Sequence, residues 1–117
     1  MAIEIRPMTA LSLWYAVTLA GVRADTPDLT QRQLAILLHV YLNPPPHTVR
    51  GLAATLQVTK PAITRALDTL GAAGLLKRRR DEDDRRNVLV QRTVKGSVFL
   101  SEFADGVARI GRTIETL

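Results

Sequence analysis

Two short segments in the middle of the chain, each opened by a threonine, constrain the fold most strongly. Thr48 can accept a backbone hydrogen bond at the start of one short helix, and Thr59 can do the same for a second. Pro61 falls in the first turn of the second helix, where a missing N–H does no harm, and Gly74 follows its end. Two short helices joined by a turn form a helix-turn-helix, whose second helix can enter the DNA major groove.

The apolar residues of this unit fit that arrangement. Six of them would lock the two helices together: Leu52, Ala53, Leu56, Val58, Ile63 and Ala66. On the second helix, at about 100° per residue, Thr64, Arg65 and Asp68 lie opposite the apolar side. Arginine can donate two hydrogen bonds to one guanine, and threonine can contact base edges or phosphates. This face therefore suits recognition of bases in the major groove. Read alone, the same face also fits the solvated side of an ordinary helix.

After Gly74 the helical period gives way to a pattern typical of a hairpin. Segments 75–80 and 87–93 are short and mix Val and Leu with basic residues, and they flank a polar turn at 81–86. Within the turn, Asp84 can pair with a neighbouring arginine and hold Arg85 or Arg86 extended toward a narrow minor groove. The turn's consecutive carboxylates lack the spacing of a calcium loop or of a catalytic acid pair. We therefore expect neither a metal site nor a catalytic site here.

The outer segments predict further helices. Residues 8–23 are apolar nearly all round, which suggests burial against a partner subunit. Thr30 and Gln33 have the spacing of a capping box for a helix that ends at Asn43 and the following prolines. A last helix from Thr93 to the chain end carries apolar residues at spacings of three and four. The residues expected at a dimer interface are Leu11, Trp14, Tyr15, Leu100, Phe103, Val107, Ile110, Ile114 and Leu117.

Length and charge limit what the chain can do. Its 117 residues fit one domain, and 16 basic against 11 acidic groups give a net charge of +5. Residues 58–95 hold ten of the basic groups and five of the acidic ones, so the positive field is local and fits an anionic partner such as nucleic acid. There is no Cys, which excludes disulfides and thiol chemistry, and no apolar run reaches the roughly 20 residues of a membrane span. We expect no enzyme activity, no cofactor and no membrane partner.

Six ordered motifs resemble the winged helix-turn-helix core of MarR-family transcriptional regulators. They are LTQRQL at 29–34, LAATLQVT at 52–59, ITRALDTL at 63–70, GLL at 74–76, DRRNV at 84–88 and TVKG at 93–96. The resemblance covers about residues 29–100 and implies a mainly α fold with a small β-hairpin. It also implies a homodimer, with residues 1–28 and 96–117 as dimerisation helices and 29–95 as the DNA-binding core. The helix at about 59–73 would lie in the major groove and the wing at 75–93 against the minor groove.

The resemblance and the charge pattern together give a list of expected contacts. Family recognition-helix contacts fall on Thr59, Lys60, Ala62, Thr64 and Arg65, and the wing pair falls on Asp84 and Arg86, with Arg86 as the minor-groove reader. Further DNA contacts are expected from Thr48 and Arg85, and phosphate contacts from Lys77, Arg78, Arg79 and Arg92. Lys60-Pro61-Ala62 replaces residues that are more polar in the family, so base preference does not carry over.

The expected function is a cytoplasmic, sequence-specific regulator of transcription that binds double-stranded DNA as a homodimer. A winged-helix module that binds another regulator or a polymerase is the alternative, and a gel shift at two salt concentrations separates the two. A small-molecule effector is a further expected partner, because family members often bind small aromatic ligands. Trp14, Tyr15, His39 and Tyr41 could line its pocket, or could simply be core residues.

Overall fold

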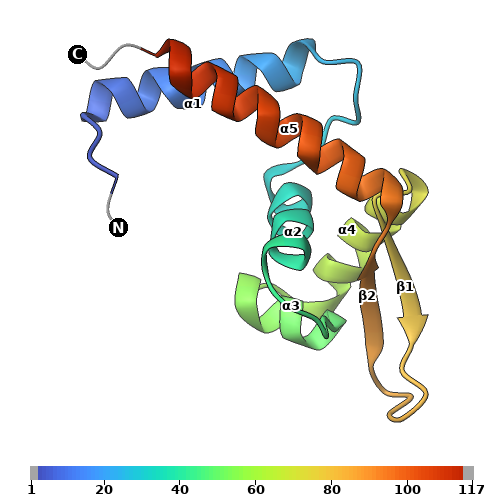
Figure 1. Cartoon of the computed structure of the whole chain (residues 1–117). Coiled ribbons are helices and arrows are strands. Elements are labelled where there is room, and N and C mark those ends of the chain that lie inside the picture. Colours follow the sequence, from blue (N-terminus) through green and yellow to red (C-terminus); the bar gives the residue numbers. More distant parts are fainter. Residues whose placement is uncertain (1–2, 115–117) are drawn as a thin grey trace. The chain divides into compact units, whose positions relative to one another are not determined.

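The computed structural model describes residues 3–114 and folds them into five helices and one two-stranded antiparallel sheet (Figure 1). The elements are α1 (Pro7–Arg23), α2 (Gln31–Leu42), α3 (Val49–Leu56), α4 (Lys60–Ala72), β1 (Leu76–Arg80), β2 (Val88–Arg92) and α5 (Val94–Thr113). They fall into two compact units. The first unit comprises α1 with the part of α5 from Leu100 onward, and the second, the winged-helix unit, is Leu29–Phe99.

Threonine side chains start every helix of the winged-helix unit. The Thr30 hydroxyl accepts from the backbone N–H of Gln33, while the Gln33 side chain accepts from the N–H of Thr30, so the predicted capping box is confirmed. The predicted caps at Thr48, Thr59 and Thr93 are confirmed as well. Their hydroxyls accept from the N–H groups of Gly51 at 2.9 Å, Ala62 at 3.3 Å and Gly96 at 2.9 Å. Each cap satisfies a donor that would otherwise lack a partner in the first turn.

The core of this unit lies between α2, α3, α4 and the hairpin. Its fully buried side chains are Ile36, Leu37, Val40, Leu52, Ile63, Leu67, Leu70, Leu75 and Val90. The turn between α3 and α4 passes through Gln57, which adopts a left-handed conformation with φ of 57°. This conformation costs a non-glycine residue roughly 1 kcal/mol. It turns the chain within the few residues between the end of α3 and the start of α4 at Lys60.

The hairpin pairs its two strands with each other and the edge of β2 with the segment before α3. β1 and β2 pair in antiparallel register from Leu76 opposite Arg92 to Arg80 opposite Val88. The outer edge of β2 also meets the segment before α3, because the N–H of Val90 donates to the carbonyl of His47 at 2.8 Å. The strands are about one residue shorter at their ends than the sequence pattern predicts.

The hydroxyl of Tyr41 connects the end of α2 to the chain leaving the hairpin. It accepts from the N–H of Thr93 at 3.0 Å and can donate to the carbonyl of Leu75 at 3.2 Å. The Thr93 hydroxyl donates to the carbonyl of Gly74 at 2.7 Å, and Gly74 has a positive φ of 76° that suits glycine. Gly96 is buried against the Tyr41 hydroxyl, so α5 starts in a fixed position on this unit.

The first unit exposes large apolar side chains. On α1, Leu11, Trp14 and Tyr15 are 62%, 65% and 66% exposed, and Met8 and Val22 are exposed as well. The buried residue of this helix is Thr9. Within residues 3–114, no helix is both long and apolar enough to cross a membrane.

Candidate nucleic-acid interface

One side of α4 faces solvent, and the other supplies much of the core. Thr59, Lys60, Thr64 and Arg65 are exposed and come from the first turns of the helix or its cap. Ile63, Leu67 and Leu70 hold this helix in place from the opposite side, as its apolar spacing predicts. The helix therefore presents hydroxyl and cationic groups on a surface whose backbone is rigidly supported.

Ala62 is much less exposed than its neighbours on that surface. The residue is only 7% exposed, whereas the sequence pattern placed it among the DNA contacts. It lies one residue before Ile63 and four before Ala66, both buried, so its methyl group turns toward the interior side of α4. Ala62 nevertheless lines the pocket described below, and its contact with DNA stays a prediction.

The tip of the hairpin holds one arginine in a defined position. Nε of Arg86 lies 3.0 Å from Oδ1 of Asp84, and its Nη2 lies 3.1 Å from Oδ2, so the ion pair is bidentate. The backbone N–H of Arg86 also donates to Oδ1 at 3.2 Å. The hydrogen bonds from Arg86 lower the pKa of the Asp84 carboxyl, and the carboxylate raises the pKa of the guanidinium. Because the Arg86 side chain remains 80% exposed, its outer face can still meet a ligand.

The four basic residues of β1 are divided between two faces of the hairpin. Arg78 donates to Oδ1 of Asp68 on α4 at 2.7 Å, which places its side chain on the α4 side. Side chains alternate along a strand, so Arg80 shares this side, and Lys77 and Arg79 point to the other. Arg80 donates to the backbone carbonyl of Arg85 and thereby closes the turn. Lys77 and Arg79 are exposed to solvent.

Arg92 is a structural residue rather than a free phosphate ligand. Its guanidinium donates to the carbonyls of Val40, Tyr41 and Asn43 at 3.1 to 3.2 Å, and it lies 5.5 Å from the centroid of the Tyr41 ring. These bonds satisfy carbonyls at the end of α2 that have no helical partner. The prediction that Arg92 contacts DNA phosphate is therefore corrected.

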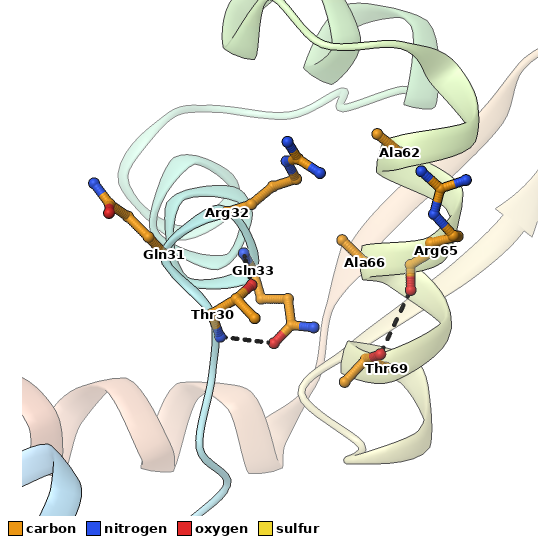
Figure 2. Close-up of a pocket in the computed structure, with 8 residues that line it drawn as sticks. All are labelled: Thr30, Gln31, Arg32, Gln33, Ala62, Arg65, Ala66 and Thr69. Carbon is orange, nitrogen blue, oxygen red and sulfur yellow. Dashed lines mark hydrogen bonds between the residues drawn. The ribbon is translucent and has the colours of Figure 1, made fainter.

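A pocket of about 420 Å³ opens between the start of α2 and the exposed side of α4. Figure 2 shows Arg32 from α2 and Arg65 from α4 extending their guanidinium groups along the two sides of this pocket. Ala66 and Thr69 continue the α4 wall, and the Thr69 hydroxyl bonds the carbonyl of Arg65. Arg32 is not among the contacts predicted from the sequence. The signal for it is a cation in the first turn of a helix that has no acidic residue there.

A family model described as the MarR family matches residues 28–87, which is more than half of the chain. The chain belongs to the MarR family. Similar solved structures include the transcriptional regulator BldR from Sulfolobus solfataricus, with 31% identity, a TM-score of 0.64, and coverage of 88% of this chain and 70% of BldR. A structure of MarR is 25% identical to this chain with a TM-score of 0.69, and the match covers 91% of this chain and 79% of the MarR chain. In a complex of S. aureus MepR with DNA, the MepR chain is 21% identical to this chain with a TM-score of 0.68. The match covers 91% of this chain and 78% of the MepR chain.

The MarR-family fold accounts for how the predicted contacts are distributed. The winged helix-turn-helix comprises α3, α4 and the hairpin, and it brings Thr59, Lys60, Thr64 and Arg65 onto one helix. Arg85 and Arg86 lie at the hairpin turn, and Thr48 starts α3, where its hydroxyl is already used as a cap. A group of three or more His, Asp or Glu side chains able to hold a metal is absent from residues 3–114.

The four aromatic residues expected around an effector have different surroundings. Trp14 and Tyr15 are exposed on α1, so neither is a core residue of the single chain. Tyr41 is engaged through both its hydroxyl and its ring. His39 lies edge-on to the buried His47, with ring centroids 5.4 Å apart, and its Nδ1 is 3.3 Å from the side-chain nitrogen of Asn43. In this family member, Tyr41 acts as a structural residue.

Proposed function

We propose that this MarR-family chain is a homodimeric transcriptional regulator that binds a specific sequence of double-stranded DNA. The observation that carries the proposal is that one rigid unit presents both an exposed cationic recognition helix and a braced wing arginine. A helix of this kind fits the major groove, and an arginine held at a hairpin tip fits a narrow minor groove. The proposed role is binding rather than catalysis, and its place is the cytoplasm, where the DNA would be.

The contacts divide into positioning and reading. Lys60, Lys77 and Arg79 are exposed cations that can bind phosphates and supply affinity that depends on salt. Thr64 and Arg65 lie where α4 would face base edges, and they would supply sequence preference. Arg86 would enter the minor groove with its orientation fixed by Asp84.

A second copy of the chain is the proposed cover for the apolar face of α1. Leu11, Trp14 and Tyr15 are all more than 60% exposed in the single chain, which is unusual for such large side chains near one another. On α5 and directly after its end, five of the residues predicted at the dimer interface are half-buried: Leu100, Phe103, Val107, Ile110 and Ile114. Leu117, also predicted there, lies outside the described residues. A dimer would place two recognition helices on successive grooves of a pseudo-palindromic site.

The proposal is tested by DNA binding measured against salt. A duplex selected from a random library and a shuffled duplex are titrated with the wild-type protein and with Arg65→Ala, and binding is followed by fluorescence anisotropy. We expect Arg65→Ala to lose about 1 to 3 kcal/mol of discrimination between the duplexes, because a bidentate base contact is removed. Equal loss on both duplexes would contradict the reading role of Arg65.

The wing is tested in the same assay by Arg86→Ala. We expect weaker binding and a shallower dependence of log K on log salt, because each phosphate-region cation contributes a slope of about 0.9. A wild-type protein that binds neither duplex at low salt would overturn the DNA-binding proposal and favour a protein-interaction module. A small-molecule effector that changes the affinity for DNA remains a prediction.

A further inference from the structure

The pocket between α2 and α4 brings two arginines together without an acidic neighbour. Arg32 and Arg65 both line it and are both exposed, and the remaining lining residues carry no carboxylate. Neither guanidinium has a hydrogen bond or ion pair with another side chain among residues 3–114. By contrast, Arg78, Arg86 and Arg92 of the same unit all have fixed partners.

Other groups at the pocket add to its positive potential. The first turn of α2 holds no acidic residue, and its Thr30 and Gln33 side chains are occupied with each other in the capping box. First-turn N–H groups of a helix lack intrahelical acceptors, and they carry a partial positive charge at this end of the helix. Figure 2 shows that the start of α2 and the middle of α4 face each other across the pocket. An anion placed there would meet positive groups from two separate elements.

We propose that this pocket binds a backbone phosphate of DNA, with Arg32 and the start of α2 as its ligands, beside the base-reading Arg65. The inference rests on the proposed function and adds α2 to the DNA-binding surface. When a helix lies in the major groove, the phosphate backbones run along its two sides. The α2 side of α4 is one of these sides, so a phosphate there would be held by Arg32 from outside the groove, while Arg65 on α4 remains available to the base edges. Such a contact fixes the position of α4 without reading a base.

The open form of the pocket favours a DNA phosphate over a free anion. Both guanidinium groups are exposed to water, and a small anion would be only weakly held against solvent at such a site. A phosphate that belongs to a duplex already docked on α4 and the wing is presented at high local concentration, so a contact that is weak by itself becomes effective.

The test compares Arg32→Gln with Arg32→Lys in the full-length protein, using the selected and shuffled duplexes. We expect Arg32→Gln to reduce the slope of log K against log salt by about 0.9 per protomer, and Arg32→Lys to restore most of it. The ratio of affinities for the two duplexes stays unchanged, because no base contact is lost. Arg112→Gln, which removes an exposed arginine in the last turn of α5, is the matched control and leaves the slope as in the wild type.

A single methylphosphonate placed in turn at each backbone position of the selected duplex locates the contact. We expect one position per half-site at which the neutral linkage weakens the wild type several-fold but leaves Arg32→Gln unaffected. An unchanged slope in Arg32→Gln, with wild-type DNA binding intact, overturns this inference and leaves the proposed function standing. A wild type that binds no duplex overturns both.

A small-anion site is distinguished by melting temperature. If inorganic phosphate raises the melting temperature of the wild type but not of Arg32→Gln, while both keep the same salt slope on DNA, the pocket serves a free anion and the proposal is wrong.

Discussion

At the residue scale, the hairpin tip shows how an acidic side chain can serve a basic surface. Asp84 lowers the net charge of the region, yet its two oxygens hold the guanidinium of Arg86 in one orientation. Arg86 alone would have to give up the freedom of a long, flexible side chain on binding. The ion pair with Asp84 orders the Arg86 side chain when the protein folds. Less side-chain entropy is then lost when Arg86 enters a DNA groove.

The first prediction concerns the pH dependence of this pair. The pKa of Asp84 lies below its ordinary value of 3.8 because Arg86 donates to the carboxylate. Its stabilising contribution is therefore complete above the ordinary value and is lost as the pH falls through the lowered one. We expect a carbon-detected NMR titration to place the Asp84 midpoint below 3.8, and Arg86→Gln to return it toward that value. A midpoint unaffected by Arg86→Gln would contradict the pairing in solution.

A second residue-scale prediction concerns Gly96. A Cβ atom built there would collide with the carbonyl oxygen of Leu75 and the hydroxyl of Tyr41. Because one of these atoms belongs to the backbone, Gly96→Ala should lower the free energy of unfolding by about 1 to 3 kcal/mol. Gly71→Ala is the control: a Cβ atom there meets only the Leu76 carbonyl oxygen at 4.0 Å, and it should stabilise α4 by about 0.5 to 1 kcal/mol. Urea denaturation of both variants, followed by circular dichroism, measures the difference.

At the element scale, α2 is fixed at its two ends by different means. Its start is closed locally by Thr30 and Gln33, whereas its end is closed from a distance by Arg92 of β2. This second closure joins the helix to the wing, because the same strand that carries Arg92 runs back to the hairpin turn. Wing position and helix position are thus coupled through one side chain.

The prediction at this scale separates stability from DNA binding. Arg92→Lys keeps the charge but loses the forked geometry, and it should reduce the free energy of unfolding by about 1 to 2 kcal/mol. The salt slope for DNA binding of the folded protein should not change. Lys77→Gln is the comparison, with normal stability and a slope reduced by about 0.9. A lower slope in an Arg92→Gln variant that remains folded would return Arg92 to the interface.

Local patterns in the sequence predict most of these elements, and long-range contacts explain what the patterns miss. The caps at Thr30, Thr48, Thr59 and Thr93 depend on residues three positions away, so their spacing is visible in the sequence. The role of Arg92 depends on carbonyls about 50 positions earlier in the chain. The local sequence of β2 does not reveal these partners, so it predicts only another exposed cation. The low exposure of Ala62 was not visible in the sequence, because helical spacing alone does not decide on which side of a boundary a small residue falls.

At the scale of the whole molecule, the single chain leaves an apolar face without cover. Met8, Leu11, Tyr15 and Val22 form one exposed stripe along α1, with Trp14 beside it. Burying such side chains contributes about 1.5 to 3 kcal/mol each, so a second copy covering this stripe would be strongly stabilised. DNA binding by the dimer then depends on the apolar stripe of α1, which is remote in sequence from α4.

The prediction at this scale is that Trp14→Glu weakens self-association. Loss of a buried aromatic anchor typically costs 2 kcal/mol or more, which is about a 30-fold increase in the dissociation constant of the dimer. Sedimentation velocity over a concentration series measures it, and the affinity for a two-half-site duplex should fall in parallel. Ala20→Glu introduces the same charge on an exposed position of the opposite side of α1 and should leave the dimer intact. If both variants sediment as the wild type does, α1 is not the dimer surface.

The four threonine caps also determine how this unit exchanges hydrogen with solvent. First-turn amides of most helices exchange freely, since nothing accepts from them. Here the amides of Gln33, Gly51, Ala62 and Gly96 each have a hydroxyl acceptor. Their deuterium uptake should therefore follow the opening of the helix starts themselves. Two of these amides, those of Gln33 and Ala62, belong to residues that line the arginine pocket, so their exchange rates provide a label-free record of whether that pocket is occupied.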